Sequence, residues 1–400
     1  MNPFDHELNR RVAALSEQRL RRELRRVDSP QGPRIEIGGK TLLNFSSNDY
    51  LGLANHPALK EAAIKAVEKF GAGAGASRLI CGSLAPFHEL EEALAAFKGV
   101  EAALTFSTGY ATALGTITAL VGKDDIVILD KLVHASIVDA ARLSGAKLRV
   151  FGHNDLNDLK DILKWAAKSQ IANRKSQILI ATESIFSMDG DAAPLGEMVA
   201  LKEKYGAWLM VDEAHATGLY GKNGRGLADE LGVSDRIEIQ MGTLGKALGA
   251  SGGYICGSRA LIDFLVNRAR SFIFSTAPVP AAAAAATAGI ILAQSPGSEA
   301  WRNALWQLVE QLNSKLKTQN SKPAGAIIPL IIGDEARVVE LATKLRGQNI
   351  FIPAIRYPTV ARGAARLRVT LTAAHSAEDV VQLVQTLADL KFEIADLKSP

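Results

Sequence analysis

Between residues 102 and 256, short apolar runs alternate with longer segments in which apolar residues recur at helical spacing. The apolar runs predict strands at residues 102–107, 126–129, 147–151, 177–182, 208–212, 238–241 and 253–256. The segments between them predict helices at residues 109–120, 134–143, 156–167 and 194–205. Strands that are apolar on both faces and separated by helices predict a mostly parallel sheet covered on both sides.

The pattern changes on both sides of this block. On the N-terminal side it predicts a charged helix at residues 1–27, a hairpin at 34–43 that turns at Gly38 and Gly39, and helices at 56–70 and 86–97. On the C-terminal side it predicts an alanine-rich helix at 281–293, strands at 327–332, 351–355 and 366–372, and helices at 335–346 and 377–390. The last helix begins with the capping-box pair Ser376 and Asp379. We therefore expect an N-terminal segment (1–50), a large α/β domain (51–285) and a smaller C-terminal α+β domain (286–400).

The composition narrows the class of protein without indicating a function. The chain has 400 residues, 48% of them hydrophobic, and its net charge of +4 is too small to demand a nucleic-acid partner. The two cysteines, Cys81 and Cys256, are too few for a disulfide framework and fit a reducing cytoplasm. No secretory signal, membrane span or metal-ligand spacing is visible. We expect a cytoplasmic protein without a membrane partner or a bound metal.

The first candidate for chemistry is a lysine in the glycine-rich stretch 242–253. Lys246 stands there among small and apolar residues, with no acidic residue close in sequence. A lysine amine held in an apolar pocket loses its proton readily, and the neutral amine attacks carbonyl carbons. The flanking glycines let the backbone approach a flat ligand closely. On this stretch alone, a surface lysine beside a glycine-rich turn is an equally good interpretation.

A buried strand that ends in acidic residues and a histidine favours the chemical interpretation. Asp212 and His215 directly follow the apolar run 207–211. Because ligands of open α/β sheets bind at the carboxyl ends of the strands, both side chains would lie near a ring that Lys246 holds. A carboxylate there would keep a pyridine nitrogen protonated, as pyridoxal phosphate requires when it acts as an electron sink. The alternative is a strand-end aspartate that caps the next turn.

Further polar residues follow other strands of the predicted sheet. Gly109 and Tyr110 stand where a strand joins a helix, and the N–H groups of that helix start suit a phosphate. His134, Ser187 and Thr243 also come just after apolar runs. Each residue alone is more often a cap or a local hydrogen-bond partner. Their shared position at the carboxyl ends of strands in one sheet makes them candidates for a cofactor site.

Several motifs together resemble the α-oxoamine synthases, which are pyridoxal-phosphate enzymes of fold type I with the aspartate-aminotransferase-like fold. The motifs are residues 44–52 (NFSSNDYLG), 186–190 (FSMDG), 211–215 (VDEAH), 242–246 (GTLGK) and 366–370 (RLRVT). The resemblance runs from the N-terminal helix to the final domain. It implies a large cofactor-binding domain with a mostly parallel sheet, a smaller C-terminal domain, and a homodimer with its sites at the interface.

The resemblance also implies a role for each matching residue. Lys246 would carry the cofactor and move a proton, and Asp212 would pair with the ring nitrogen. His215 would hydrogen-bond the ring oxygen, and His134 would stack on the ring and donate a proton. The other cofactor contacts would be Gly109, Tyr110, Ser187, Thr243 and, from the neighbouring subunit, Thr276. The substrate contacts would be Asn48 and Arg368 for the amino-acid carboxylate, and Thr359 with Arg22, or with Arg21, Arg25 or Arg26 in its place, for the acyl substrate.

The implied reaction is a decarboxylative condensation of L-alanine with the pimeloyl thioester of CoA or of acyl carrier protein, in biotin biosynthesis. Residues 153–156, 354–360 and 370–375 resemble that branch of the family more than glycine C-acetyltransferase or 5-aminolevulinate synthase. The arginine-rich N-terminus would be a collar for an acidic substrate or a solvated helix face. Other classes are a non-catalytic partner subunit, disfavoured by the presence of Lys246, and a nicotinamide dehydrogenase, disfavoured by the absent glycine fingerprint. The choice between CoA and carrier protein stays open.

Overall fold

The computed structural model describes residues 2–169, 176–316 and 325–390. Contacts divide the chain into two compact units. The large unit comprises Asn48–Ser187 and Asp191–Asn303, and the small unit comprises Met1–Ser47, Met188–Gly190 and Ala304–Pro400. The expected division into segments 1–50, 51–285 and 286–400 stays a prediction about domains.

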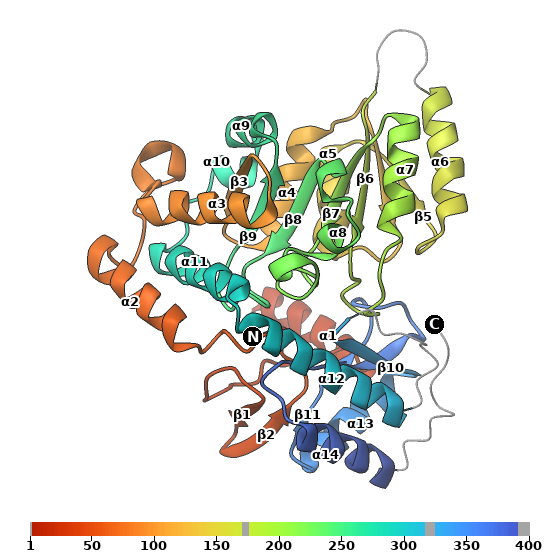
Figure 1. Ribbon diagram of the computed structural model, residues 1–400. Coiled ribbons are helices and arrows are strands. Elements are labelled where there is room, and N and C mark those ends of the chain that lie inside the picture. The colour runs from red at the N-terminus through yellow and green to blue at the C-terminus, as the bar shows by residue number, and fades with distance from the viewer. Residues whose placement is uncertain (1, 170–175, 317–324, 391–400) are drawn as a thin grey trace. The chain divides into compact units, whose positions relative to one another are not determined.

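The large unit is built on a seven-stranded sheet with the order β3-β9-β8-β7-β6-β4-β5 (Figure 1). Its strands are β3 (Ala102–Phe106), β4 (Ile126–Asp130), β5 (Lys147–Phe151), β6 (Ile178–Glu183), β7 (Trp208–Asp212), β8 (Ile239–Thr243) and β9 (Gly253–Gly257). β9 runs antiparallel to β3 and β8, and the remaining neighbours are parallel. The predicted mostly parallel sheet is confirmed. We call the edge at which β4 to β8 end the carboxyl edge and the opposite edge the amino edge.

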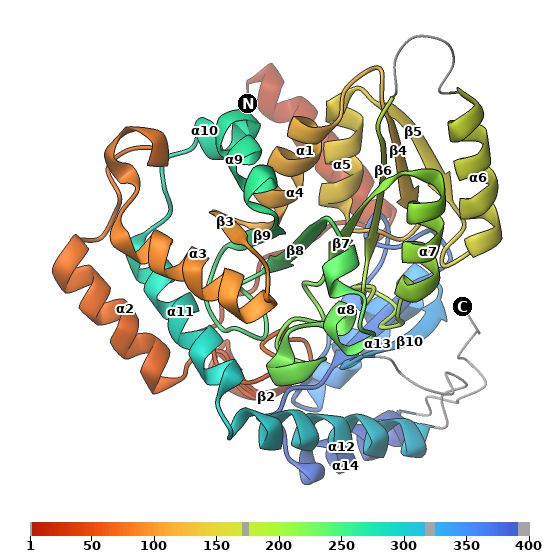
Figure 2. The ribbon, with the colours of Figure 1, turned by 45° about the horizontal axis from the view of Figure 1, so that its top comes forward.

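Helices cover both faces of this sheet. The helices that lie wholly in the large unit are α2 (Pro57–Phe70), α3 (Ala85–Lys98), α4 (Gly109–Leu120), α5 (Ala135–Ser144), α6 (Leu156–Ser169), α7 (Leu195–Tyr205), α8 (Leu227–Glu230), α9 (Arg259–Arg268), α10 (Arg270–Ile273) and α11 (Pro280–Gln294), with short helical turns η1 (Arg78–Gly82), η2 (Lys222–Gly224) and η3 (Ser234–Arg236). α4 packs on α5, α6 packs on α7, and α11 packs on α2 and α3. Figures 1 and 2 show the α4–α5 and α6–α7 pairs on opposite faces of the sheet.

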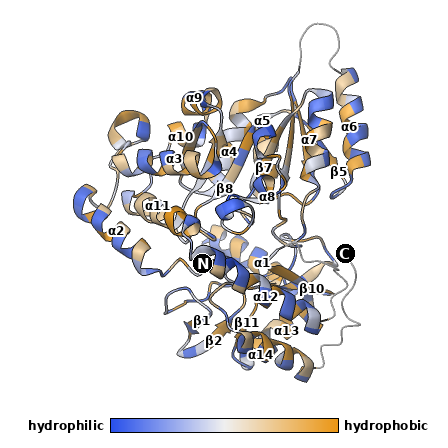
Figure 3. Cartoon of the chain, viewed as in Figure 1, coloured by the Kyte–Doolittle hydropathy of each residue, from blue (hydrophilic) through white to orange (hydrophobic). Residues whose placement is uncertain are grey.

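The apolar pattern explains these layers. β4 and β6 are buried along their whole length, because helices cover both of their faces. α6 buries Leu159, Leu163 and Ala166 completely, at a spacing that places all three on one face of the helix. Hydrophilic residues occupy much of the rest of α6 (Figure 3). Each such leucine contributes roughly 1.5–3 kcal/mol through burial, so Leu163→Ala would destabilise this unit by about 2–5 kcal/mol.

The small unit contains two three-stranded sheets, with the orders β1-β2-β11 and β10-β13-β12. Their strands are β1 (Arg34–Ile37), β2 (Lys40–Asn44), β10 (Ile327–Gly333), β11 (Ile350–Phe351), β12 (Ala354–Ile355) and β13 (Ala365–Thr370). The helices are α1 (Pro3–Glu17), α13 (Glu335–Gly347) and α14 (Ala377–Asp389), and α12 (Ser298–Leu316) contributes residues to both units. The hairpin at residues 34–43 and the capping box of Ser376 and Asp379 are confirmed.

The predicted N-terminal helix is too long. α1 ends at Glu17, and Arg19 adopts a left-handed conformation with φ of 58° that a continuing helix does not allow. α1 buries none of its residues. Without an apolar face to pack, a charged helix has little tertiary stabilisation, and residues 20–27 follow it without regular structure.

The single strand predicted at residues 351–355 is two strands. β11 pairs in parallel with β2, whereas β12 pairs antiparallel with β13 in the other sheet. Pro353 stands between them. Because proline has no N–H to donate and a fixed φ, it interrupts one ladder and lets the chain change sheets.

Candidate active site

Lys246 lies in the turn that connects β8 to β9 at the carboxyl edge. The turn is folded back on itself, since Leu244 N–H donates to the Gly252 carbonyl and the Thr243 hydroxyl donates to the same oxygen at 2.9 Å. Lys246 is half-buried, and its Nζ lies 2.8 Å from Nε2 of His215. The lysine is thus held in place by the fold and by a hydrogen bond rather than extended into solvent.

His215 is buried and has a partner at each ring nitrogen. Nε2 faces Lys246, and Nδ1 lies 2.6 Å from Oη of Tyr50. Tyr50 in turn donates to Oδ1 of Asn48 at 3.3 Å. Because the Tyr50 hydroxyl donates its hydrogen bond to Asn48, its oxygen can accept from Nδ1–H of His215. Nε2 of His215 then has no proton and accepts a hydrogen bond from the lysine amine. The sequence did not predict Tyr50, which is 1% exposed, although it belongs to the motif at residues 44–52.

Two acidic residues lie side by side at the same edge. Asp212 ends β7 and Glu183 ends β6, and they are register partners in this parallel pair. Burial raises the pKa of Asp212, whereas Lys246 and the backbone N–H of Ala214 act in the opposite direction. Burial and the neighbouring Asp212 raise the pKa of Glu183 to about 8. Sequence reasoning selected Asp212 and missed Glu183, although both end an apolar run.

His134 stands directly before α5 and caps it. Its Nδ1 accepts the backbone N–H of Ser136 at 3.3 Å and lies 2.8 Å from the Ser136 hydroxyl. Although the side chain is exposed, desolvation by the atoms around it lowers the pKa of His134. Asp212 favours the cation and Lys246 disfavours it. Both charges act on the ring because the three residues lie near one another at the carboxyl edge.

The start of α4 is the part of this edge that suits an anion. Thr108 caps the helix by accepting an N–H of the first turn at 3.0 Å, and Tyr110 donates its Oη–H to Asp139 at 2.6 Å. The first N–H groups of a helix have no partner inside it. The neighbouring strand approaches closely, because a Cβ on Gly253 would lie only 2.8 Å from Cα of Gly109. Glycine at that position therefore brings β9 against the helix start.

The other residues predicted to contact a cofactor have different surroundings. Ser187 is buried, and its N–H donates to Oε2 of Glu183 at 3.1 Å. Thr243 uses its hydroxyl to close the lysine turn. Thr276 is exposed on the segment between α10 and α11, where it forms an isolated β-bridge with Ser77.

The small unit joins two residues that were predicted for the acyl substrate. Arg22 donates from Nη2 to Oγ1 of Thr359 at 3.0 Å, and Arg356 donates to the backbone carbonyl of Arg21 at 2.6 Å. Desolvation and the charge of Arg22 lower the pKa of Arg356. We call Arg22, Arg356 and Thr359 the arginine cluster. The side chain of Arg21 instead pairs with Glu23 at 3.5 Å.

Arg368 and Asn48, the residues predicted for the amino-acid carboxylate, are both held by the fold. Arg368 lies on β13, is buried, and donates from Nη1 to the Thr370 hydroxyl at 3.0 Å. Asn48 belongs to the large unit, where it accepts the hydroxyl of Tyr50.

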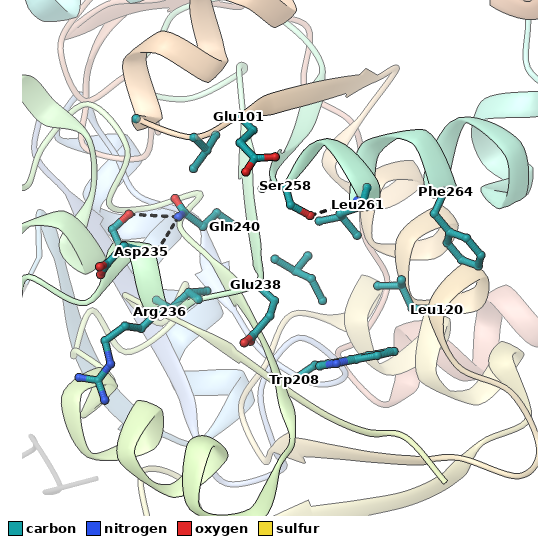
Figure 4. A pocket seen from close by; sticks show the side chains of 17 residues that line it. Glu101, Leu120, Trp208, Asp235, Arg236, Glu238, Gln240, Ser258, Leu261 and Phe264 are labelled. Carbon is teal, nitrogen blue, oxygen red and sulfur yellow. Dashed lines mark hydrogen bonds between the residues drawn. The ribbon is translucent and has the colours of Figure 1, made fainter. Parts of the chain in front are cut away.

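A pocket of about 710 Å³ lies at the amino edge, away from Lys246 (Figure 4). Leu120, Trp208, Leu261 and Phe264 line it together with Glu238. No motif in the sequence points to this pocket, because its lining comes from separate places, namely the loop after α3, the end of α4, the turn η3, the starts of β7 and β8, and α9.

Residues 2–169, 176–316 and 325–390 contain neither a membrane-spanning helix nor a cluster of metal ligands. No helix there is long and apolar enough to cross a membrane. In the same residues, no group of three or more His, Cys, Asp or Glu side chains is placed to hold a metal ion.

Comparison with known families identifies the class of protein to which this fold and site belong. A model of the aminotransferase class I and II family matches residues 40–387, so the chain belongs to that family. Serine palmitoyltransferase from S. paucimobilis, solved with a bound adduct of PLP and myriocin, is similar to this chain with a TM-score of 0.90 and 28% identity. That similarity covers 99% of this chain and 100% of that one.

Curated relatives narrow the similarity to one branch. The chain is 46% identical to 8-amino-7-oxononanoate synthase from Geotalea daltonii, over 97% of both chains. It is 48% identical to the 8-amino-7-oxononanoate synthase from Anaeromyxobacter dehalogenans, over 94% of this chain and 93% of that one. The resemblance predicted from the motifs, including its biotin branch, is confirmed.

Proposed function

We propose that this chain condenses L-alanine with the pimeloyl thioester of CoA or of acyl carrier protein in biotin biosynthesis. The products are 8-amino-7-oxononanoate, CO2 and the free thiol. Similarity to synthases of that name over nearly the whole chain supports this reaction. The observation in this chain that carries it is Lys246, held 2.8 Å from His215 at the edge where Asp212 is buried.

Pyridoxal 5′-phosphate is the cofactor that fits these residues. Lys246 supplies an amine, and the start of α4 at Gly109 and Tyr110 supplies N–H groups suited to a phosphate. Asp212 is a buried carboxylate whose charge is disfavoured by desolvation, so a protonated ring nitrogen would stabilise it. When bound, the cofactor withdraws electrons from the substrate carbon that carries the amino group.

The lysine and its histidine partner would carry the proton-transfer step. Lys246 would hold the cofactor through Nζ and later take the α-proton of L-alanine at the same atom. Nε2 of His215 accepts one N–H of that amine, and so orients the nitrogen lone pair. The buried Tyr50–His215 pair fixes the imidazole ring, which preserves this geometry during turnover.

His134 would donate a proton to the thioester oxygen. Its pKa is lowered, so the ring is mostly neutral near pH 7. In the neutral ring, Nδ1 accepts the N–H of Ser136 and the proton is on Nε2. Nε2–H would therefore face the developing negative charge as a general acid.

The arginine cluster would bind the distal carboxylate of the pimeloyl chain. A guanidinium binds a carboxylate through two parallel hydrogen bonds, and Thr359 holds Arg22 in place at 3.0 Å. A site built around such a contact discriminates strongly against acyl groups that lack it. Arg368 and Asn48 would bind the carboxylate of the amino acid.

We also propose a homodimer, in which Thr276 of one copy reaches the cofactor phosphate of the other. Exposed apolar side chains lie in the two segments joined by the Ser77–Thr276 bridge, namely Ile80 at 79% and Phe274 at 70%. Exposed apolar patches are typical of protein interfaces. Sedimentation at assay concentrations tests this, and an active monomer would refute it. The cytoplasmic location stays a prediction from the cysteine content.

The experiment that tests the reaction is a competition assay. Purified protein is given L-alanine or glycine with pimeloyl, acetyl or succinyl thioesters, and thiol release is measured. We expect L-alanine and the pimeloyl thioester to be preferred. Glycine with acetyl-CoA would indicate glycine C-acetyltransferase instead, and glycine with succinyl-CoA would indicate 5-aminolevulinate synthase. CoA and carrier-protein thioesters are compared in the same assay.

A further inference from the structure

Glu183 is a buried acid that, among the residues described here, forms no ion pair. It is 2% exposed and stands beside Asp212 in the β6–β7 ladder. Because side chains alternate between the two faces along each strand, directly paired residues of parallel strands point to the same face. The two carboxyl groups therefore share one face of the sheet. By contrast, the buried Glu213 forms an ion pair with Lys98.

The carboxyl group of Glu183 binds backbone instead of a cation. Its Oε2 accepts the N–H of Ser187 at 3.1 Å. The backbone N–H of His134 is near enough to favour the carboxylate, and the buried Oε1 has no hydrogen-bond partner among the described residues. Ser187 lies in the turn that follows β6, and His134 lies between β4 and α5. One side chain thus lies between two loops that carry residues of the proposed site.

The charge state of Glu183 suits this position. Desolvation and Asp212 disfavour the carboxylate, whereas Lys246 and the backbone N–H groups of His134 and Ser187 favour it, and its pKa is about 8. Near neutral pH the group is therefore mostly a neutral acid. It can hold both loops without placing a second negative charge next to Asp212.

We propose that Glu183 is a positioning residue that fixes the backbone of His134 and of Ser187 relative to Asp212. The roles of those residues rest on the proposed function, but the tethering is a property of the chain itself. If the tether is lost, the imidazole of His134 moves relative to Asp212, and proton donation becomes slower.

Two substitutions separate the tether from the charge. Glu183→Gln keeps an oxygen that accepts N–H groups but removes the ionisable proton, whereas Glu183→Leu removes the acceptor. Asp125 provides a matched control at the amino edge of the same sheet. Its carboxylate accepts the N–H groups of Gly122 and Gln177, each at 2.9 Å, so Asp125→Leu also removes a carboxylate that tethers backbone.

The first measurement is amide hydrogen exchange in the cofactor-free protein. In E183L we expect the amide of Ser187 to exchange at least about 10-fold faster, because it loses a buried acceptor, and the amide of His134 to exchange faster as its loop is released. In E183Q the change should stay below about 3-fold, and D125L should leave both amides as in the wild type. Unchanged exchange at both amides in E183L would overturn the proposal.

The second measurement uses the enzyme loaded with pyridoxal phosphate. E183L should lower kcat about 10-fold or more with a smaller change in KM for the amino acid, and E183Q should lower it less. If E183L does not fold, Glu183→Met, which also lacks the acceptor but keeps a long side chain, takes its place, and unchanged exchange at Ser187 in that variant overturns the proposal. If the wild type turns over no thioester, the proposed function fails, whereas the exchange experiment still decides the role of Glu183.

Discussion

The two edges of the large sheet differ in the surroundings of their acidic side chains. At the amino edge, where Figure 4 shows the pocket, charged side chains have ordinary partners. Glu238 forms an ion pair with Lys202, and Glu101 accepts the N–H of Arg259 at 2.8 Å. At the carboxyl edge, Glu183 and Asp212 are buried side by side and have raised pKa values.

This difference teaches that a large pocket and a reactive site are separate features. The amino-edge pocket, at about 710 Å³, has the volume of a ligand site. Perturbed titratable groups beside a specific charge indicate chemistry more directly, and these lie at the other edge. In open α/β sheets the carboxyl edge also receives the helix starts, so anions and rings bind there.

The largest effect on turnover should come from replacing the lysine at the carboxyl edge, with a lysine at the amino edge replaced as the control. Lys246→Ala should lower turnover by about 10³-fold or more, since it removes both the covalent anchor and the base. Borohydride should fix the cofactor to Lys246 in the wild type and to no peptide in the variant. Lys202→Met is the control at the amino edge, and it should keep the label while losing roughly 1–3 kcal/mol of stability. A label on another lysine would contradict the conclusion that the reactive lysine lies at the carboxyl edge.

A smaller effect is expected from the histidine that caps α5. His134→Phe should retain cofactor binding, measured by absorbance, and lose condensation by roughly 10²-fold, the scale of a general acid. His56 caps α2 in the same way, because its Nδ1 accepts the Ala58 N–H at 3.2 Å. His56→Phe should therefore cost about 1 kcal/mol of stability with turnover preserved. Near-normal turnover in His134→Phe would reduce that residue to a cap.

The carboxyl edge also holds a histidine that supports the fold. Burial opposes the cation of His153, but Nδ1 lies 3.0 Å from Asp130 and Nε2 lies 2.8 Å from Asp191, and together they raise its pKa to about 10. Its stabilising effect is fully present below the unfolded pKa of about 6.5 and is lost as pH rises through about 10.

Urea unfolding of wild type and His153→Gln tests this dependence on pH. The difference in unfolding free energy should be about 1–3 kcal/mol at pH 6 and should shrink towards pH 10. A difference that grows with pH would show that the cation does not stabilise the fold.

The smallest effect on activity should come from filling the amino-edge pocket. Leu261→Trp places a larger side chain there and should change turnover by less than about 2-fold, because the site lies at the other edge. Overpacking would lower stability by about 1–3 kcal/mol, measured by thermal unfolding. A large loss of activity with intact stability would mean that the pocket communicates with Lys246.

The fold was predictable wherever burial imposed one period on the residues. The buried strands β4 and β6 and the amphipathic helix α6 were predicted within a few residues. The prediction was wrong where no buried face existed, as in α1, and where one proline sent the chain from one sheet to another, as at Pro353. The length of α1 and the change of sheet at Pro353 are both set by tertiary contacts, which hydrophobic periodicity does not report.

The site was predictable as a set of residues after strands, but not as a network. Lys246, Asp212, His215 and His134 lie near one another at one edge. Tyr50 and Glu183 were missed, because a buried tyrosine or an acid at the end of a strand resembles an ordinary core or capping residue. Their importance comes from partners far away in sequence, namely His215 for Tyr50 and His134 for Glu183.

The antiparallel direction of β9 has a consequence for how the lysine is held. A parallel strand after β8 would need a long crossover through a helix, whereas an antiparallel neighbour is reached by a direct turn. Lys246 is therefore in a short closed loop, both ends of which are fixed in adjacent strands. The conformational entropy of that loop is lost once, when the protein folds. The loss is modest because the loop is short, and each doubling of loop length would add only about 0.6 kcal/mol. The amine consequently reaches each substrate already confined, and little of the binding free energy is spent on ordering it.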